Sequence, residues 1–117
     1  MLARLLGLLQ IVVGVCLWLG IATGLVKLHT GLGSLLVLVA WVVAGIALFA
    51  LPQRRIPLIT LLMGGVVLWF GMAQTTLLPG TMHWAVRVVH LLLGLALLGL
   101  IETLRKAVSQ HLATRGE

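Results

Sequence analysis

The chain has 117 residues, of which 62% are hydrophobic and only 9% are charged. Soluble domains are about half apolar, so this composition excludes an ordinary soluble domain and indicates an integral membrane protein surrounded by a lipid bilayer. The formal net charge is +6, but the basic residues are scattered along the chain. A nucleic-acid-binding surface needs clustered positive charge, so this function is not expected.

A hydrocarbon core of about 30 Å requires roughly 20 apolar residues for each helical crossing. In chain order, four such stretches fit, over about 5–25, 28–51, 56–78 and 82–104. The apolar runs are continuous rather than alternating, which favours helices over a membrane β-barrel. We therefore predict an all-α, integral membrane four-helix bundle in which residues 1–117 form a single transmembrane domain.

Basic residues gather at one set of the predicted helix ends. These are Arg4, Arg54, Arg55, Arg105, Lys106 and Arg115. Only Lys27 and Arg87 lie near the opposite ends. The positive-inside rule then predicts that both termini face the cytoplasm, with the chain in the inner (cytoplasmic) membrane. The first apolar stretch is expected to remain as an anchor, because it is longer than the apolar region of a signal peptide.

The sequence contains an internal repeat on the scale of a helical hairpin. GVCLWLGIA at 14–22 aligns with GVVLWFGMA at 65–73, and HTGLGSLL at 29–36 aligns with HLLLGLAL at 90–97. Under the predicted orientation both copies start on the same side of the membrane. The two hairpins are therefore expected to be parallel repeats, related by an axis along the membrane normal.

Each repeat carries one histidine that is followed by glycine four residues later, on the same helix face. The repeat symmetry predicts that His29 and His90 lie at similar depth and face a shared axis. Gly33 and Gly94 would leave room for the edge of a flat macrocycle, whose metal two opposed imidazoles can ligate. Ionisable residues at membrane depth usually face the bundle interior and have a function. We therefore predict a cofactor site with His29 and His90 as metal ligands.

His83 and Arg87 share the helix face of His90. His83 lies about 10.5 Å from His90 along the helix, so the two cannot ligate one metal from the same side. It is left as a candidate for a hydrogen bond to a propionate or for a second cofactor, or has no special role. The guanidinium of Arg87 would hold a haem propionate, which offsets the cost of about 2.5–3.5 kcal/mol for arginine at a helix centre.

The sequence lacks the acidic residues that hydrolases, proton pumps and small multidrug exporters use. The two acidic residues are Glu102 and Glu117, so a carboxylate pair for hydrolysis or proton pumping is not available, and we expect no catalysis beyond electron transfer. A small multidrug exporter would need a carboxylate in the first helix, where this chain has none. The competing structural explanation of the histidines is hydrogen bonding between helices.

The segments LLQIVVGVCLWLG…GLVKLHTGLGSLL and VVLWFGMAQTTLLPGTMHWAVRVVHLLLGLALLGL resemble one four-helix half of the haem A synthase family. More broadly they are similar to small membrane cytochrome b-type subunits. That family has two such halves, each with a histidine pair on its second and fourth helices. The resemblance implies that His29 and His90 take these positions. The chain departs from the family because it is one half, lacks a glutamate just before His29 and lacks an outer-loop cysteine pair. The resemblance therefore implies the haem-holding scaffold rather than synthase activity.

Together these features predict a membrane protein that binds haem b, and hence iron, and transfers electrons. Its partner would be quinol or a redox protein, and it would be an accessory subunit of a larger complex. One alternative is a (bacterio)chlorophyll-binding subunit with a single histidine on magnesium. The other is a cofactor-free structural subunit, in which the two histidines would face different neighbours and lie more than about 10 Å apart.

Overall fold

The computed structural model describes residues 2–115, and Met1, Gly116 and Glu117 lie outside this range. Four α-helices and one short 3-10 turn make up the described chain: α1 (Leu2–Trp18), η1 (Thr23–Leu25), α2 (Val26–Ala50), α3 (Arg55–Ala73) and α4 (His83–Arg115). The described residues contain no strand. The prediction of an all-α bundle is confirmed.

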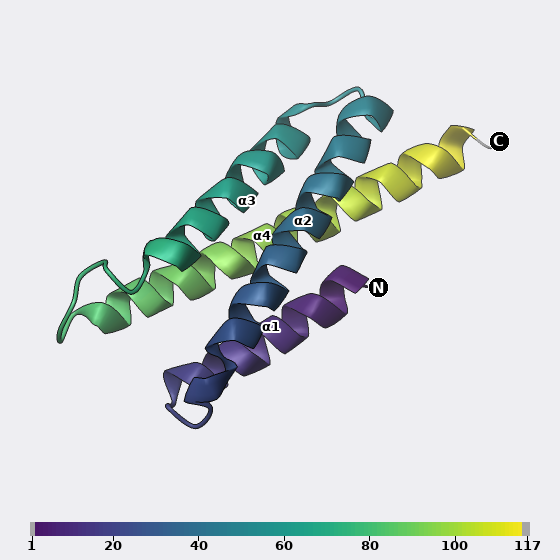
Figure 1. Ribbon diagram of the computed structural model, residues 1–117. Helices are drawn as coiled ribbons and strands as arrows, with labels where there is room; N and C mark the ends of the chain where they lie inside the picture. Colours follow the sequence, from purple (N-terminus) through teal and green to yellow (C-terminus); the bar gives the residue numbers. More distant parts are fainter. Residues whose placement is uncertain (1, 116–117) are drawn as a thin grey trace.

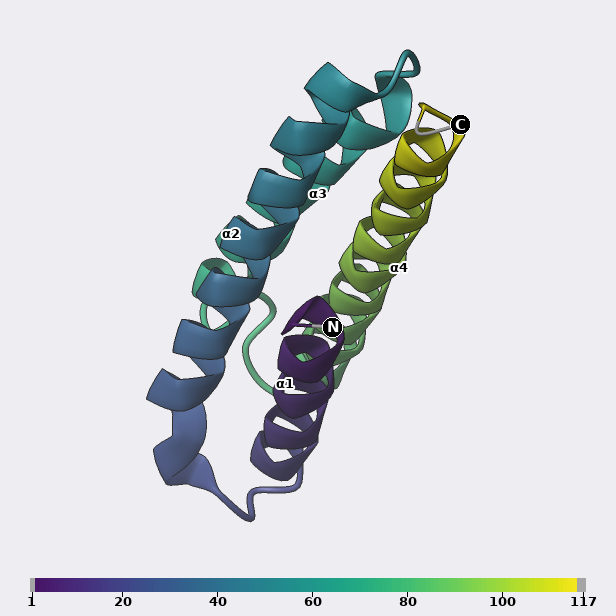
Figure 2. The same cartoon turned by 90° about the vertical axis from the view of Figure 1, so that its right-hand side faces the viewer.

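The helices form an elongated bundle that measures 56 × 23 × 17 Å. Within each hairpin the helices are antiparallel, so that α1 runs parallel to α3 and α2 runs parallel to α4 (Figure 1). α2 and α4 contact each other along the middle of the bundle, with α1 and α3 on its two sides (Figure 2). Between α1 and α3 no contact is found in the part of the chain that the structure describes.

Three segments are long and apolar enough to cross a membrane: α2 together with η1, α3 and α4. α1 is also apolar, but its 17 residues rise only about 25 Å at 1.5 Å per residue. This rise is shorter than a hydrocarbon core of about 30 Å. The chain is therefore a membrane-type helical bundle with three full-length spans and one shorter helix.

α1 ends at Trp18, before the end of the predicted stretch at 25, because Gly20 reverses the chain there. Gly20 has a φ of +70°, which glycine adopts without steric cost. Its N–H donates to the carbonyl of Leu17, and the N–H of Ile21 donates to the carbonyl of Cys16. This pair of bonds is the Schellman pattern that closes helix C-termini.

The other helix ends also differ from the predicted stretches. α3 ends at Ala73 rather than 78, and the connection that follows contains Leu78 and Gly80, both with positive φ. α4 continues to Arg115 rather than ending at 104. Hydropathy marks where a chain leaves the lipid, whereas a helix continues for as long as its residues favour helix formation.

Fully buried side chains lie where α2 meets α4, toward the connection at 51–54. Ala40, Ala44 and Ala47 of α2 are all 0% exposed, and Leu97 and Leu104 of α4 belong to the same two buried clusters. Small residues spaced one helical turn apart allow the helices to approach closely. The space between α2 and α4 at this level is therefore filled by side chains, and a second, more open cavity lies beyond it at the connection itself.

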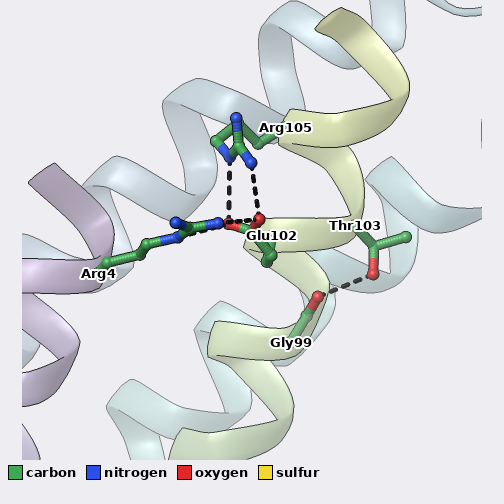
Figure 3. Close-up of polar contacts among 5 residues, drawn as sticks. All are labelled: Arg4, Gly99, Glu102, Thr103 and Arg105. Atoms are coloured by element: carbon green, nitrogen blue, oxygen red, sulfur yellow. Dashed lines mark hydrogen bonds and ion pairs between the residues drawn. The ribbon is translucent and has the colours of Figure 1, made fainter. Parts of the chain in front are cut away.

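One ion-pair network ties α1 to α4 (Figure 3). The carboxylate of Glu102 accepts hydrogen bonds from the guanidinium groups of Arg4 and Arg105, the latter at 2.7 and 3.1 Å. The guanidinium groups are largely exposed, and exposed ion pairs contribute little to stability. The network therefore serves mainly to set the position of α1 along α4.

Candidate functional site

A cavity of about 350 Å³ lies between the helices, on the side of the connections at 19–25 and 74–82. Polar residues line it near these connections: Thr23, Gln74, Thr75, His83 and Arg87. Apolar core residues close its other end: Leu36, Val37 and Leu97. Cofactor and small-molecule sites have volumes of about 300–1,000 Å³ and the same combination of apolar walls with a few polar groups.

His29 of α2 and His90 of α4 both line this cavity. Their ring centres lie 6.2 Å apart, and the ring planes are inclined by 60°. The separation is below the roughly 10 Å beyond which the two rings could not share one metal. The bundle thus brings together the two histidines that are 61 positions apart in the sequence (90 − 29).

Each histidine ring is seated against a glycine of the preceding helix. A Cβ atom at Gly14 would lie 3.0 Å from Cε1 of His29, and one at Gly71 would lie 3.2 Å from Cε1 of His90. Gly65, which the sequence repeat aligns with Gly14, has no such neighbour within 4 Å. The two hairpins therefore share a glycine–histidine contact, but the longer second connection shifts its register relative to the sequence alignment.

The two rings differ in their other neighbours. Nε2 of His29 lies 3.2 Å from the side-chain amide nitrogen of Gln10. His90 instead stacks on Phe70, with ring centres 6.0 Å apart and an interplanar angle of 12°. The sequence analysis missed both neighbours. Gln10 could have been singled out from the sequence, because it is the one amide side chain in the apolar helix α1.

Three buried side-chain atoms at the cavity have no hydrogen-bond partner among the described residues: Oε1 of Gln10, Nδ1 of His29 and Nδ1 of His90. A buried polar atom without a partner costs about 1–3 kcal/mol. Such atoms are rare in folded proteins, and they concentrate at sites with a redox, catalytic or ligand-binding role. All three belong to the same cluster, which singles out the histidine pair as the candidate site.

The separation of the rings fits two imidazoles on opposite sides of one metal. An imidazole built from bonds of about 1.3 Å has a radius of about 1.1 Å, and a metal–imidazole bond measures about 2 Å. Ring centres across one metal are then about 6.2 Å apart, which equals the 6.2 Å observed. The inclination of 60° is no obstacle, because each ring can turn about its own metal–nitrogen bond.

The donor set also indicates what kind of metal would fit. No group of three or more His, Cys, Asp or Glu side chains with metal-binding geometry exists between residues 2 and 115. A bare metal ion needs four or more ligands and would find only two imidazoles here. The residues present therefore suit a metal that brings its remaining ligands with it, as iron does in a porphyrin.

The other predicted site residues lie around this pair. His83 is at the first turn of α4, where Nδ1 is 3.3 Å from the carbonyl oxygen of Leu77. It lines the same cavity but belongs to its rim. Arg87 is exposed at this rim, and no ion-pair partner for it is found among residues 2–115.

The two predicted glycines have different surroundings. A Cβ atom at Gly94 would meet nothing within 4 Å, so this glycine faces open space in the cavity. A Cβ atom at Gly33 would lie 2.8 Å from the amide nitrogen of Gln10. The room at Gly33 is thus used by a side chain from α1.

No protein-family model matches this chain, and no match is found among the curated proteins or the solved structures. The likeness to one half of a haem A synthase therefore stays a prediction. What the described residues establish is a membrane-type helical bundle with three histidines on one cavity, His29 and His90 in its interior and His83 at its rim.

Proposed function

We propose that this protein is a membrane-embedded, cytochrome b-like electron-transfer protein that holds one haem b between His29 and His90. The observation that carries the proposal is the separation of 6.2 Å between the two imidazole rings on a cavity of about 350 Å³. Both histidines would ligate the haem iron and leave it no open position. This coordination favours electron transfer over oxygen chemistry, because no position remains open.

The haem supplies the one-electron iron couple, and the chain supplies binding and orientation. Phe70 stacks on His90 and restricts the rotation of that ring. Gly94 leaves open space for the edge of a macrocycle. Arg87, exposed at the cavity rim, is suited to neutralise a propionate with its guanidinium. His83 stays a candidate for a hydrogen bond at the same rim.

The proposal includes an orientation. Arg54, Arg55 and Lys106 lie at the end of the bundle opposite the cavity, and positive residues favour the cytoplasmic side. Both termini would then be in the cytoplasm, and the haem would lie in the outer half of the inner membrane. Quinol or a redox protein would exchange electrons from that side, with the chain as an accessory subunit of a larger complex.

Optical spectroscopy of the purified protein tests the proposal. We expect a reduced-minus-oxidised difference spectrum with a b-type band and one haem per chain. H29A and H90A should each lose the bis-histidine spectrum. H111A is the matched control, because His111 does not line this cavity, and it should keep the spectrum.

Two results would contradict the haem assignment. One is a wild-type protein that is colourless and takes up no haem, as expected of a cofactor-free structural subunit. The other is the extraction of a magnesium pigment, as expected of a (bacterio)chlorophyll-binding subunit. A b-type band that persists in both H29A and H90A would retain haem binding but exclude these two ligands.

A further inference from the structure

Gln10 of α1 reaches into α2 at a position where α2 has no side chain. Its amide nitrogen lies 3.2 Å from Nε2 of His29. A Cβ atom at Gly33 would lie only 2.8 Å from the same amide nitrogen. Glycine at 33 thus provides the space in which Gln10 contacts His29, and two independent features of the packing support one polar contact.

This contact has a chemical consequence for His29. An amide nitrogen only donates hydrogen bonds, so Nε2 of His29 must accept and must carry a lone pair. A neutral imidazole that accepts at Nε2 carries its proton on Nδ1, and an imidazolium ion cannot accept at all. The Gln10 contact is therefore compatible with one form of the ring, the neutral form protonated on Nδ1.

We propose that Gln10 is a positioning residue for His29, which holds this ring in the neutral, Nδ1-protonated tautomer with the Nε2 lone pair directed at the Gln10 amide. His90 has no equivalent, because it stacks on Phe70 and makes no hydrogen bond within residues 2–115. The two ligand positions are therefore unequal: one tautomer is selected at His29, and none is selected at His90.

The tautomer is a property of the cofactor-free protein. Its importance for binding rests on the proposed function, in which the Nε2 lone pair of His29 is the one that a haem iron takes. Gln10 and the iron then compete for this lone pair. The amide keeps the ring in the neutral form that can ligate a metal. Because its hydrogen bond must break before iron binds, it also lowers the affinity of His29 for iron relative to that of His90.

Nitrogen NMR of the cofactor-free protein, labelled with ¹⁵N-histidine in detergent micelles, tests the tautomer directly. The wild type should show His29 protonated on Nδ1. In Q10L the preference should be lost, because leucine offers no hydrogen bond. In Q10E it should reverse to Nε2–H, because a carboxylate only accepts. Q110L is the control, since Gln110 is exposed and does not line the histidine cavity.

A wild-type His29 protonated on Nε2 would overturn the inference, because Gln10 would then present its oxygen. Unchanged tautomers in both Q10L and Q10E would also overturn it. The wild-type spectrum decides the question even where a variant fails to fold. The H29A spectrum assigns the resonances.

Titration with haemin adds a second measurement. Because Q10L removes the competing donor, its affinity should increase about five-fold, equivalent to about 1 kcal/mol for one hydrogen bond. Q110L should bind as the wild type does. An unchanged or weaker affinity in Q10L would contradict the competition between amide and iron. If no variant binds haemin, the proposed function fails, while the NMR result still decides the role of Gln10.

Discussion

The two halves of this bundle use small residues in opposite ways. Toward the connection at 51–54, fully buried alanines of α2 let α4 approach until side chains fill the space between these two helices. Toward the other connections, Gly14 and Gly71 lie against the rings of His29 and His90, next to an open cavity. Small residues thus have two roles in this bundle. Where aliphatic side chains face them, they allow two helices to pack closely; where a histidine faces them, they leave room for its ring.

Removing a large side chain from the closed half should have the largest effect on stability. Leu104 is 1% exposed and packs against Ala44 and Ala47. L104A should lower the free energy of unfolding by about 2–5 kcal/mol, as expected for a truncated core leucine. Denaturant unfolding in detergent measures this change. L92A, at a leucine that is 58% exposed, is the matched control and should leave stability nearly unchanged. Equal losses in both variants would contradict the distinction between core and lipid-facing leucines.

Two adjacent glycines of α3 should differ in how well they tolerate a methyl group, with a change in stability of intermediate size. A Cβ atom at Gly64 would lie 2.5 Å from Nε1 of Trp41, whose N–H donates to the carbonyl of Leu61 at 3.1 Å. G64A should therefore destabilise the protein by about 1–3 kcal/mol through overpacking. G65A has no neighbour within 4 Å and should be neutral or slightly stabilising, because alanine favours the helix. Thermal unfolding of the two variants side by side measures the difference, and a destabilised G65A would refute this account.

The glycine seats of the histidines should give the smallest change in stability but a specific change at the site. G14A and G71A each place a methyl group 3.0 or 3.2 Å from a histidine Cε1, a few tenths of an ångström closer than ordinary van der Waals contact. Each should displace its own ring and weaken haemin binding about ten-fold, equivalent to about 1.4 kcal/mol. The Cε1–H resonance of the affected histidine should shift, and that of the other histidine should not. G31A, where nothing lies within 4 Å, should bind as the wild type does; weakened binding there would refute the seating argument.

The features that depend on a single helix could be predicted from the sequence. Continuous apolar runs predicted the four helices, and a helical face can be assigned from spacing alone, as for His90 and Gly94. The contact between Gln10 and His29 and the register of the glycine seats were not predicted. They depend on how far one helix slides and rotates against another, which the connections and the packed alanines determine together. The end of α1 was predictable in principle, because Gly20 is a typical helix-terminating residue.

The shortness of α1 has a consequence for the surrounding membrane. Its first turns are held to α4 by the contact of Arg4 with Glu102, so the deficit in length falls at the opposite end. There the exposed side chains of Leu19 and Ile21 continue beyond the helix. A hydrophobic mismatch of this kind is relieved when lipids thin locally around the short segment. The bilayer is therefore expected to be thinnest beside α1, on the flank of the bundle next to the cavity, where the headgroup region would come closest to the interior.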